Sequence, residues 1–114
     1  MESLPIIEKI YSLYAHAADI AAHSEKRWRY TLAQKAEASI LELLSEVAMA
    51  RHAPRPLKSP YLLRASGRLE TLKFSLRLML DFKVANETKI FQAQSRAAEI
   101  GRMLGGWLKS LGAL

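Results

Sequence analysis

Apolar residues recur along this chain at intervals of three and four positions, which is the period of an amphipathic helix. Four segments carry this pattern, and none of them has the strict alternation that marks a half-buried strand. The pattern therefore predicts an all-α fold with four helices. The predicted core positions are, in chain order, Ile6, Ile10, Leu13, Ala17 and Ile20; Leu32, Ala36, Ile40, Leu43 and Val47; Leu62, Ala65, Leu69, Leu72, Leu76 and Met79; and Ile90, Ala93, Ala97, Ile100 and Leu104.

Capping residues indicate where two of these helices begin. The first helix is predicted to run over residues 5–23. The second is predicted to follow Thr31, because the spacing from Thr31 to Gln34 matches a capping box. The fourth is predicted to begin at Asn86, a residue type that favours the N-cap position.

Prolines separate the second helix from the third. Pro54, Pro56 and Pro60 forbid a continuous helix, since each removes a backbone donor and restricts the residue before it. Ser59 and Pro60 are therefore predicted to form the cap and first turn of the third helix. Because short connections make neighbouring helices antiparallel, the predicted architecture is an up-down-up-down four-helix bundle, a single domain over residues 1–114.

The first and third predicted helices carry more apolar surface than a bundle core requires. In a soluble chain, surplus apolar surface is typical of an interface, so we expect the protein to form a homo-oligomer. The residues outside the core lines that create this surplus are Ile7, Tyr11, Tyr14, Ala18 and Ala21 in the first helix, and Leu63, Gly67, Phe74, Leu78 and Ala85 in or after the third.

The last helix adds a strip of small residues at Ala98, Gly101 and Gly105. A glycine in a helix interior costs about 1 kcal/mol relative to alanine, so the missing side chains indicate that another backbone comes close. That backbone belongs either to a second subunit or to a neighbouring helix of the same bundle. The sequence leaves both interpretations open.

The chain is basic, with 17 lysines and arginines against 11 acidic residues and a formal net charge of +6. This charge favours an anionic partner, with nucleic acid ahead of a membrane surface, although it also serves solubility. The absence of cysteine excludes disulfides and thiolate metal sites. The chain starts without a signal-peptide pattern and contains no apolar stretch of about 20 residues, so we expect a cytoplasmic protein that does not enter a membrane.

The sharpest candidate for a nucleic-acid contact is the segment over residues 26–30, where Lys26, Arg27 and Arg29 alternate with Trp28 and Tyr30. Cations neutralise phosphates and aromatic rings stack on unpaired bases. Alternatively, both aromatic residues fold inward and close the end of the bundle. Further candidate contacts with RNA or a polymerase are Arg51, Arg55 and Lys58 around the proline turn, and Arg64, Arg68, Lys73 and Arg77 in the third helix. Arginines in such positions also commonly pair with carboxylates.

No catalytic pattern stands out in the sequence. His16, Asp19 and His23 share a face of the first helix, but that face is polar and specifies no fourth ligand. Phosphate-binding glycine loops, nucleophile elbows and Glu-x-x-His pairs are absent from the sequence. We therefore expect no enzyme activity, no metal and no cofactor.

Several segments together resemble one known family. They are the block over residues 99–109, the segment Arg29-Tyr30-Thr31-Leu32, and the segments over residues 69–73 and 76–78. This combination is similar to the accessory variability determinant (Avd) proteins of diversity-generating retroelements. The resemblance implies a four-helix bundle that assembles into a ring-like homopentamer with a basic surface. It also implies a non-catalytic accessory protein that binds the retroelement's reverse transcriptase and template RNA, and so supports mutagenic cDNA synthesis.

Two other interpretations remain at this stage. Four-helix-bundle proteins encoded in intervening sequences of ribosomal RNA genes share this size and part of the last helix. Those proteins typically carry a proline and a glycine early in the second helix, whereas residues 35–41 here contain neither, which favours Avd. The remaining interpretation is a basic structural oligomer that binds only a protein partner.

Overall fold

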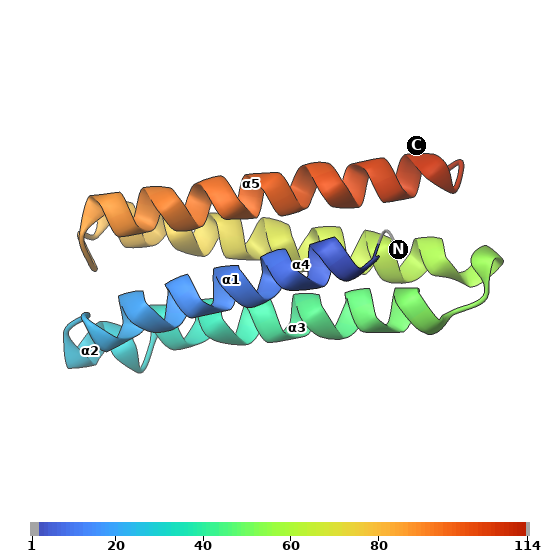
Figure 1. Cartoon of the computed structure of the whole chain (residues 1–114). Coiled ribbons are helices and arrows are strands. Elements are labelled where there is room, and N and C mark those ends of the chain that lie inside the picture. Colours follow the sequence, from blue (N-terminus) through green and yellow to red (C-terminus); the bar gives the residue numbers. More distant parts are fainter. Residues whose placement is uncertain (1–2, 114) are drawn as a thin grey trace.

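Four long helices and one short helix make up the structure, a computed structural model that describes residues 3–113. The long helices are α1 (Ser3–Ala22), α3 (Leu32–His52), α4 (Arg55–Asp81) and α5 (Glu87–Ser110), and the short helix is α2 (Lys26–Arg29). Successive long helices run in opposite directions, as Figure 1 shows. The described residues contain no strand. The predicted all-α four-helix architecture is confirmed, with α2 as an addition that the sequence pattern did not indicate.

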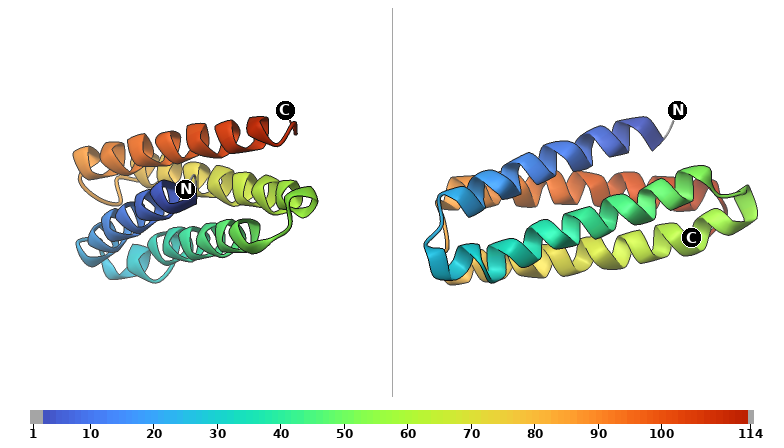
Figure 2. Two further views of the ribbon diagram at one scale, coloured as in Figure 1. Left: turned by 45° about the vertical axis from the view of Figure 1, so that its right-hand side comes forward. Right: turned by 90° about the horizontal axis from the view of Figure 1, so that it is seen from below.

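Each long helix packs against two of the other three. Helix α1 lies against α3 and α5, and α4 lies against the same two helices, so α1 and α4 are diagonal partners (Figures 1 and 2). The bundle measures 44 × 20 × 20 Å. We call the end that carries α2 and the α4–α5 turn the α2 end. The α3–α4 turn and the last turn of α5 lie at the opposite end (Figure 1).

The core contains nearly all the apolar positions that the helical period predicts. One prediction is wrong, because Leu32 is only half-buried and Ala33 takes the inward position at the start of α3. The predicted capping box is also wrong: Thr31 makes no side-chain cap, and its hydroxyl donates instead to the Arg27 carbonyl oxygen. The short helix α2 brings this carbonyl within reach of Thr31, so the turn before α3 has a different geometry from the one that the spacing suggested.

Helix α4 begins at Arg55, so the predicted start at Ser59 and Pro60 is wrong. The Leu57 amide donates to the Pro54 carbonyl oxygen at 2.8 Å and closes the first turn. Pro56 fits this turn because its missing N–H would have no helical partner there. Pro60 lies inside the helix and removes one backbone bond, and both prolines are exposed. Water can therefore solvate the freed carbonyl group, and the helix continues through Pro60.

The glycines of α5 are not required by packing within the subunit. A Cβ atom at Gly101 would lie 3.4 Å from Leu69 Cδ2, which is an ordinary contact, and one at Gly105 or Gly106 would meet nothing within 4 Å. Close approach of two helices of the same bundle therefore does not explain the strip of small residues. The interpretation that the strip faces another molecule remains.

Candidate nucleic-acid interface

The 17 lysines and arginines fall into three groups according to what they contact. Six form ion pairs with carboxylates, and three donate hydrogen bonds to the last carbonyl groups of helices. Among the described residues, the other eight do neither. These eight are Lys26, Arg27, Lys35, Arg51, Lys83, Arg96, Arg102 and Lys109.

Four of the six basic candidates on α4 are paired with acidic residues. Two of the pairs cross to α3 and two are local to α4. Exposed pairs of this kind contribute little to stability, but they reduce the local positive charge. Their role in binding RNA or a polymerase stays a prediction. The four pairs are Arg64 with Glu46 at 3.2 Å, Arg68 with Glu42 at 2.9 Å, Lys73 with Glu70 at 3.7 Å and Arg77 with Asp81 at 3.2 Å.

Three other predicted contacts are occupied by helix ends. Lys58 Nζ donates to the carbonyl oxygens of Ala50 and Arg51 near the end of α3, at 2.8 and 3.1 Å. Arg55 Nη2 donates to the Ser110 carbonyl oxygen at the end of α5, at 3.0 Å. Such bonds satisfy carbonyl groups that have no helical partner and place positive charge at the negative end of the helix dipole.

Arg29 has the same role at the end of α1. Its guanidinium donates to the carbonyl oxygens of Ala21, Ala22 and Ser24, at 3.2 to 3.3 Å. The spacing of residues along the sequence does not reveal these capping bonds. The only available signal was that Arg29, Arg55 and Lys58 each follow a break between helices.

The α2 end combines unpaired cations with exposed aromatic rings. Lys26 and Arg27 come from α2, and Lys83 comes from the α4–α5 turn. The ring centroids of Trp28 and Phe82 lie 5.6 Å apart, which brings these two segments together. The Arg27 guanidinium lies 4.2 Å from the Trp28 ring centroid.

The aromatic residues at the α2 end differ in burial. Each of the two interpretations, a plug at the end of the bundle and an exposed contact, therefore accounts for some of them. Trp28 is half-buried and packs against the core, as expected for a residue that closes the end of the bundle. Tyr30 is 60% exposed and Phe82 is 58% exposed. The α2 end therefore presents aromatic surface and positive charge together. Phe82 and Lys83 belong to it, although the sequence pattern does not single them out.

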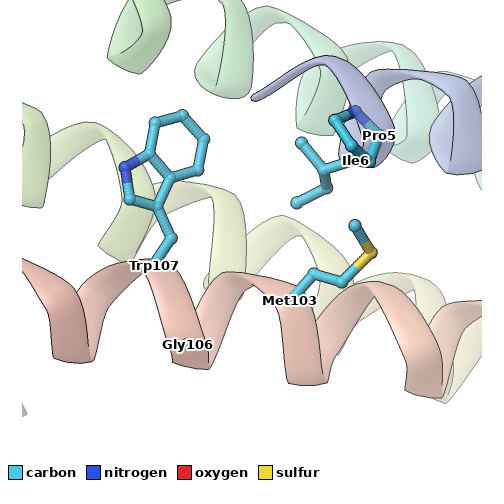
Figure 3. A pocket seen from close by; sticks show the side chains of 5 residues that line it. All are labelled: Pro5, Ile6, Met103, Gly106 and Trp107. Carbon is cyan, nitrogen blue, oxygen red and sulfur yellow. The ribbon is translucent and has the colours of Figure 1, made fainter. Parts of the chain in front are cut away.

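The opposite end is basic but has a different character. Arg51, Arg102 and Lys109 are unpaired in the described part of the chain. Arg51 lies on the last turn of α3 and Lys109 on the last turn of α5, and Arg102 lies earlier on α5. Between α1 and α5 lies an apolar pocket of about 260 Å³, in which Met103 and Trp107 face Pro5 and Ile6 (Figure 3). The pocket's lining has no ionisable side chain, so it offers no group for acid–base chemistry.

The polar face of α1 holds an ion pair. Asp19 Oδ2 accepts from Lys89 Nζ at 2.9 Å, and Asp19 Oδ1 lies 3.2 Å from His23 Nδ1. The hydrogen bond from Lys89 lowers the pKa of Asp19 below its ordinary value of 3.8. Over residues 3–113, no group of three His, Cys, Asp or Glu side chains is placed to hold a metal ion.

Two apolar surfaces on different sides of the bundle contain most of the predicted interface residues. Along α4 runs an exposed line that we call the α4 stripe, and its Phe74 is 68% exposed. Between α1 and α3 lies a groove of about 350 Å³ that we call the α1/α3 groove. Ala85, which was also predicted to add exposed apolar surface, is half-buried and is not part of the stripe. The α4 stripe comprises Leu63, Gly67, Thr71, Phe74 and Leu78, and the groove is lined mainly by Tyr11, Tyr14, Ala15, Leu41 and Leu44.

Of the two predicted glycines of α5, Gly101 borders a further groove. Gly101 lines a shallow groove of about 420 Å³ between α4 and α5, together with Lys73, Ala98 and Arg102. Gly105, one turn further on, is half-buried. The predicted interface positions therefore do not form one continuous patch on the subunit.

These features define a small basic helical bundle whose unpaired cations and exposed aromatic rings lie on its surface. The sequence matches the family described as bAvd-like over residues 4–111, and the chain belongs to this family. Membership indicates the accessory, non-catalytic class of protein found in diversity-generating retroelements. No curated protein matches the sequence.

The fold also occurs in a solved structure. A protein of unknown function from the S23 ribosomal protein family of Bacteroides thetaiotaomicron superposes with a TM-score of 0.84. The match covers 96% of this chain and 99% of the other, at 13% identity, so it establishes a likeness of fold. Within residues 3–113, no helix has the length and apolar character needed to cross a bilayer.

Proposed function

We propose that this chain is a non-catalytic partner of a retroelement reverse transcriptase, and that it binds the polymerase and its template RNA to support mutagenic cDNA synthesis. The observation that carries this proposal is the family match over residues 4–111. The eight cations without a partner among the described residues support an anionic partner, because those residues leave their charge unneutralised. Those closest to exposed aromatic rings lie at the α2 end, which makes this end the preferred RNA contact.

The proposal includes assembly of the chain into a ring, with five subunits as the resemblance implies. The α4 stripe and the α1/α3 groove support a contact between two unlike surfaces, since α4 and α1 are diagonal partners in the bundle. A head-to-tail contact of this kind closes into a ring when the rotation between subunits allows it.

Binding of the purified protein to the template RNA and to the reverse transcriptase tests the function. We expect RNA affinity to fall with salt, with log K decreasing by about 0.7 per phosphate for each tenfold rise in salt. Replacing Lys26 and Arg27 together by alanine should flatten this dependence, whereas replacing the paired Arg64 and Arg68 should change it less. Absence of both RNA and polymerase binding at low salt would overturn the proposal.

A second candidate function is a structural oligomer that meets only the polymerase. The observation that favours it is that nine of the cations, including seven of the predicted contacts, are already occupied by carboxylates or helix ends. Retained polymerase binding without RNA binding by the isolated protein would select this candidate.

A further inference from the structure

Two segments far apart in the sequence, α2 and the α4–α5 turn, bring aromatic rings and unpaired cations together at the α2 end. From this juxtaposition we propose that Phe82 forms a stacking site for an unpaired base of single-stranded nucleic acid, with Lys83 and Arg27 as phosphate contacts. The inference rests on the proposed nucleic-acid function and specifies both the site and the form of the ligand.

Phe82 has the position and support that a stacking ring requires. It lies just after the last residue of α4, and more than half of its surface faces solvent. Its contact with Trp28 holds the two rings at 46° to each other, and Trp28 packs in turn against the core. Phe82 is therefore both accessible and supported by a neighbour that is fixed in the bundle.

Lys83 stands where a glycine would be expected. Its φ of 55° lies in the left-handed region, which costs a lysine more than a glycine. The Lys83 amide donates to the Leu80 carbonyl oxygen, and the Val84 amide donates to the Met79 carbonyl oxygen at 2.9 Å, which is the bonding of a helix C-terminal motif usually made by glycine. This turn keeps an exposed cation directly beside Phe82.

Arg27 supplies the second cation, from α2, on the other side of the contact between Trp28 and Phe82. Its guanidinium lies over the Trp28 ring and makes no ion pair in the described residues. A guanidinium held by stacking keeps its N–H groups available for phosphate oxygens. The site therefore combines the two elements that single-strand binding uses, a ring for the base and cations for the backbone.

The site favours a single strand over a duplex. Bases in a duplex are stacked on one another and leave no face for a protein ring, whereas an unpaired base can turn outward onto one. Aromatic stacking also tolerates any base, so the expected recognition is of strand form rather than of sequence.

Titration of the full-length protein with a fluorescent oligouridylate, and with a duplex RNA of equal length, tests the inference. We expect Phe82→Ala to lower the affinity for oligouridylate about tenfold and to leave duplex binding nearly unchanged. Phe91→Ala is the matched control, because Phe91 is also half-exposed but lies outside this cluster on α5. Equal affinities of wild-type protein and Phe82→Ala would overturn the inference.

A second pair of variants tests the cation. Lys83→Gln should reduce the salt slope for oligouridylate by about 0.7, the value for one phosphate contact on a single strand. Lys109→Gln, which removes an unpaired lysine at the opposite end, should leave the slope unchanged. Equal effects of the two substitutions would overturn the assignment of Lys83, since they would reflect net charge alone.

Light scattering of each variant separates this site from a subunit contact. If Phe82→Ala changes the molecular mass, Phe82 belongs to an interface between subunits, and the inference fails. If wild-type protein binds template RNA and Phe82→Ala binds it equally well, the inference fails while the proposed function stands. If wild-type protein binds no RNA of any form, the inference fails together with the RNA-binding part of the proposed function, and polymerase binding then decides between the second candidate and rejection of both.

Discussion

Arg29, Arg55 and Lys58 each close the carbonyl end of a helix that precedes or neighbours them. Arg29 makes the most such bonds, because its guanidinium reaches three carbonyl oxygens at the end of α1. A charged donor to an otherwise unpaired carbonyl group typically contributes more than a neutral one. Part of the basic character of this chain therefore stabilises the subunit itself.

Arg29→Ala should lower the free energy of unfolding by about 1–2 kcal/mol, because the carbonyl groups of Ala22 and Ser24 lose their side-chain donor and that of Ala21 keeps only a backbone donor. Lys26→Ala, three residues earlier and unpaired, should change it by less than about 0.5 kcal/mol. Urea unfolding of both variants, followed by circular dichroism, gives the comparison. Indistinguishable unfolding midpoints for the two variants would show that the Arg29 bonds do not stabilise the subunit.

Sequence patterns predicted the buried residues better than the functional surface. Ile40 and Leu72 are recognisable as core residues because the helical period depends only on local spacing. The capping role of Arg29 was not recognisable, because it depends on where the chain turns after α1. Phe82 was missed for the same reason: only the folded chain places it beside Trp28.

At the scale of elements, α1 is connected to α5 by two ion pairs near opposite ends of the contact. Lys9 pairs with Glu99 at 2.9 Å, and Lys89 pairs with Asp19 at 2.9 Å. The hydrogen bond from Lys9 lowers the pKa of Glu99 below its ordinary value of 4.5, as the bond from Lys89 lowers the pKa of Asp19. Both pairs thus favour the ionised carboxylate in the folded state.

A lowered carboxylate pKa makes stability depend on pH in the acid range. Because the unfolded chain binds these protons more tightly, the contribution is complete above the ordinary values of 3.8 and 4.5, and it is lost as the pH falls through the lower folded values. We expect thermal stability to decline below about pH 4.5. The thermal stability of the double variant Asp19→Asn, Glu99→Gln should decline less over the same pH range.

The matched control for this experiment is Glu8→Gln, which removes an exposed carboxylate of α1 that has no basic partner in the described residues. Thermal unfolding of the three proteins between about pH 6 and about pH 3 gives the comparison. An acid decline that is as steep in the double variant as in wild-type protein would exclude these two pairs as its source.

Helix boundaries were predictable where side chains act locally. Asn86 was expected to cap α5, and its side-chain oxygen accepts from the Lys89 amide at 3.3 Å. Helix α4 starts earlier than the prolines suggested, because Pro56 falls in the first turn, where no helical N–H bond is lost, and the exposed Pro60 leaves a carbonyl group that water can solvate. Helix α2 was not predicted, because its four residues are too few to display a period.

At the scale of the whole molecule, the fold tolerates wide sequence change. The Bacteroides protein shares 13% of its residues with this chain and still superposes over 96% of it. A bundle of this kind requires apolar residues of suitable size at core positions and leaves most of its surface free to vary. The positions outside the core lines therefore carry the properties particular to this chain, including its unpaired cations and its two apolar surfaces.

Assembly through the α4 stripe and the α1/α3 groove makes a specific prediction. Phe74→Glu should reduce the mass in solution towards the 12.8 kDa of one chain, because it places a charge at the centre of the stripe. Tyr11→Glu, which places a charge in the α1/α3 groove, should reduce the mass in the same way. Phe91→Glu, on α5, is the control that should retain the wild-type mass. Light scattering gives the masses, and a wild-type protein of 12.8 kDa would contradict self-association.

Mixing the two disrupted variants distinguishes a head-to-tail contact from a symmetric one. Phe74→Glu retains an intact groove and Tyr11→Glu retains an intact stripe, so an equimolar mixture should form one-to-one dimers that cannot grow into rings. If the stripe instead packs on its own copy, Tyr11→Glu alone should dimerise and mixing should add nothing. The mass of the mixture therefore decides whether unlike surfaces meet, which is the condition for a closed ring.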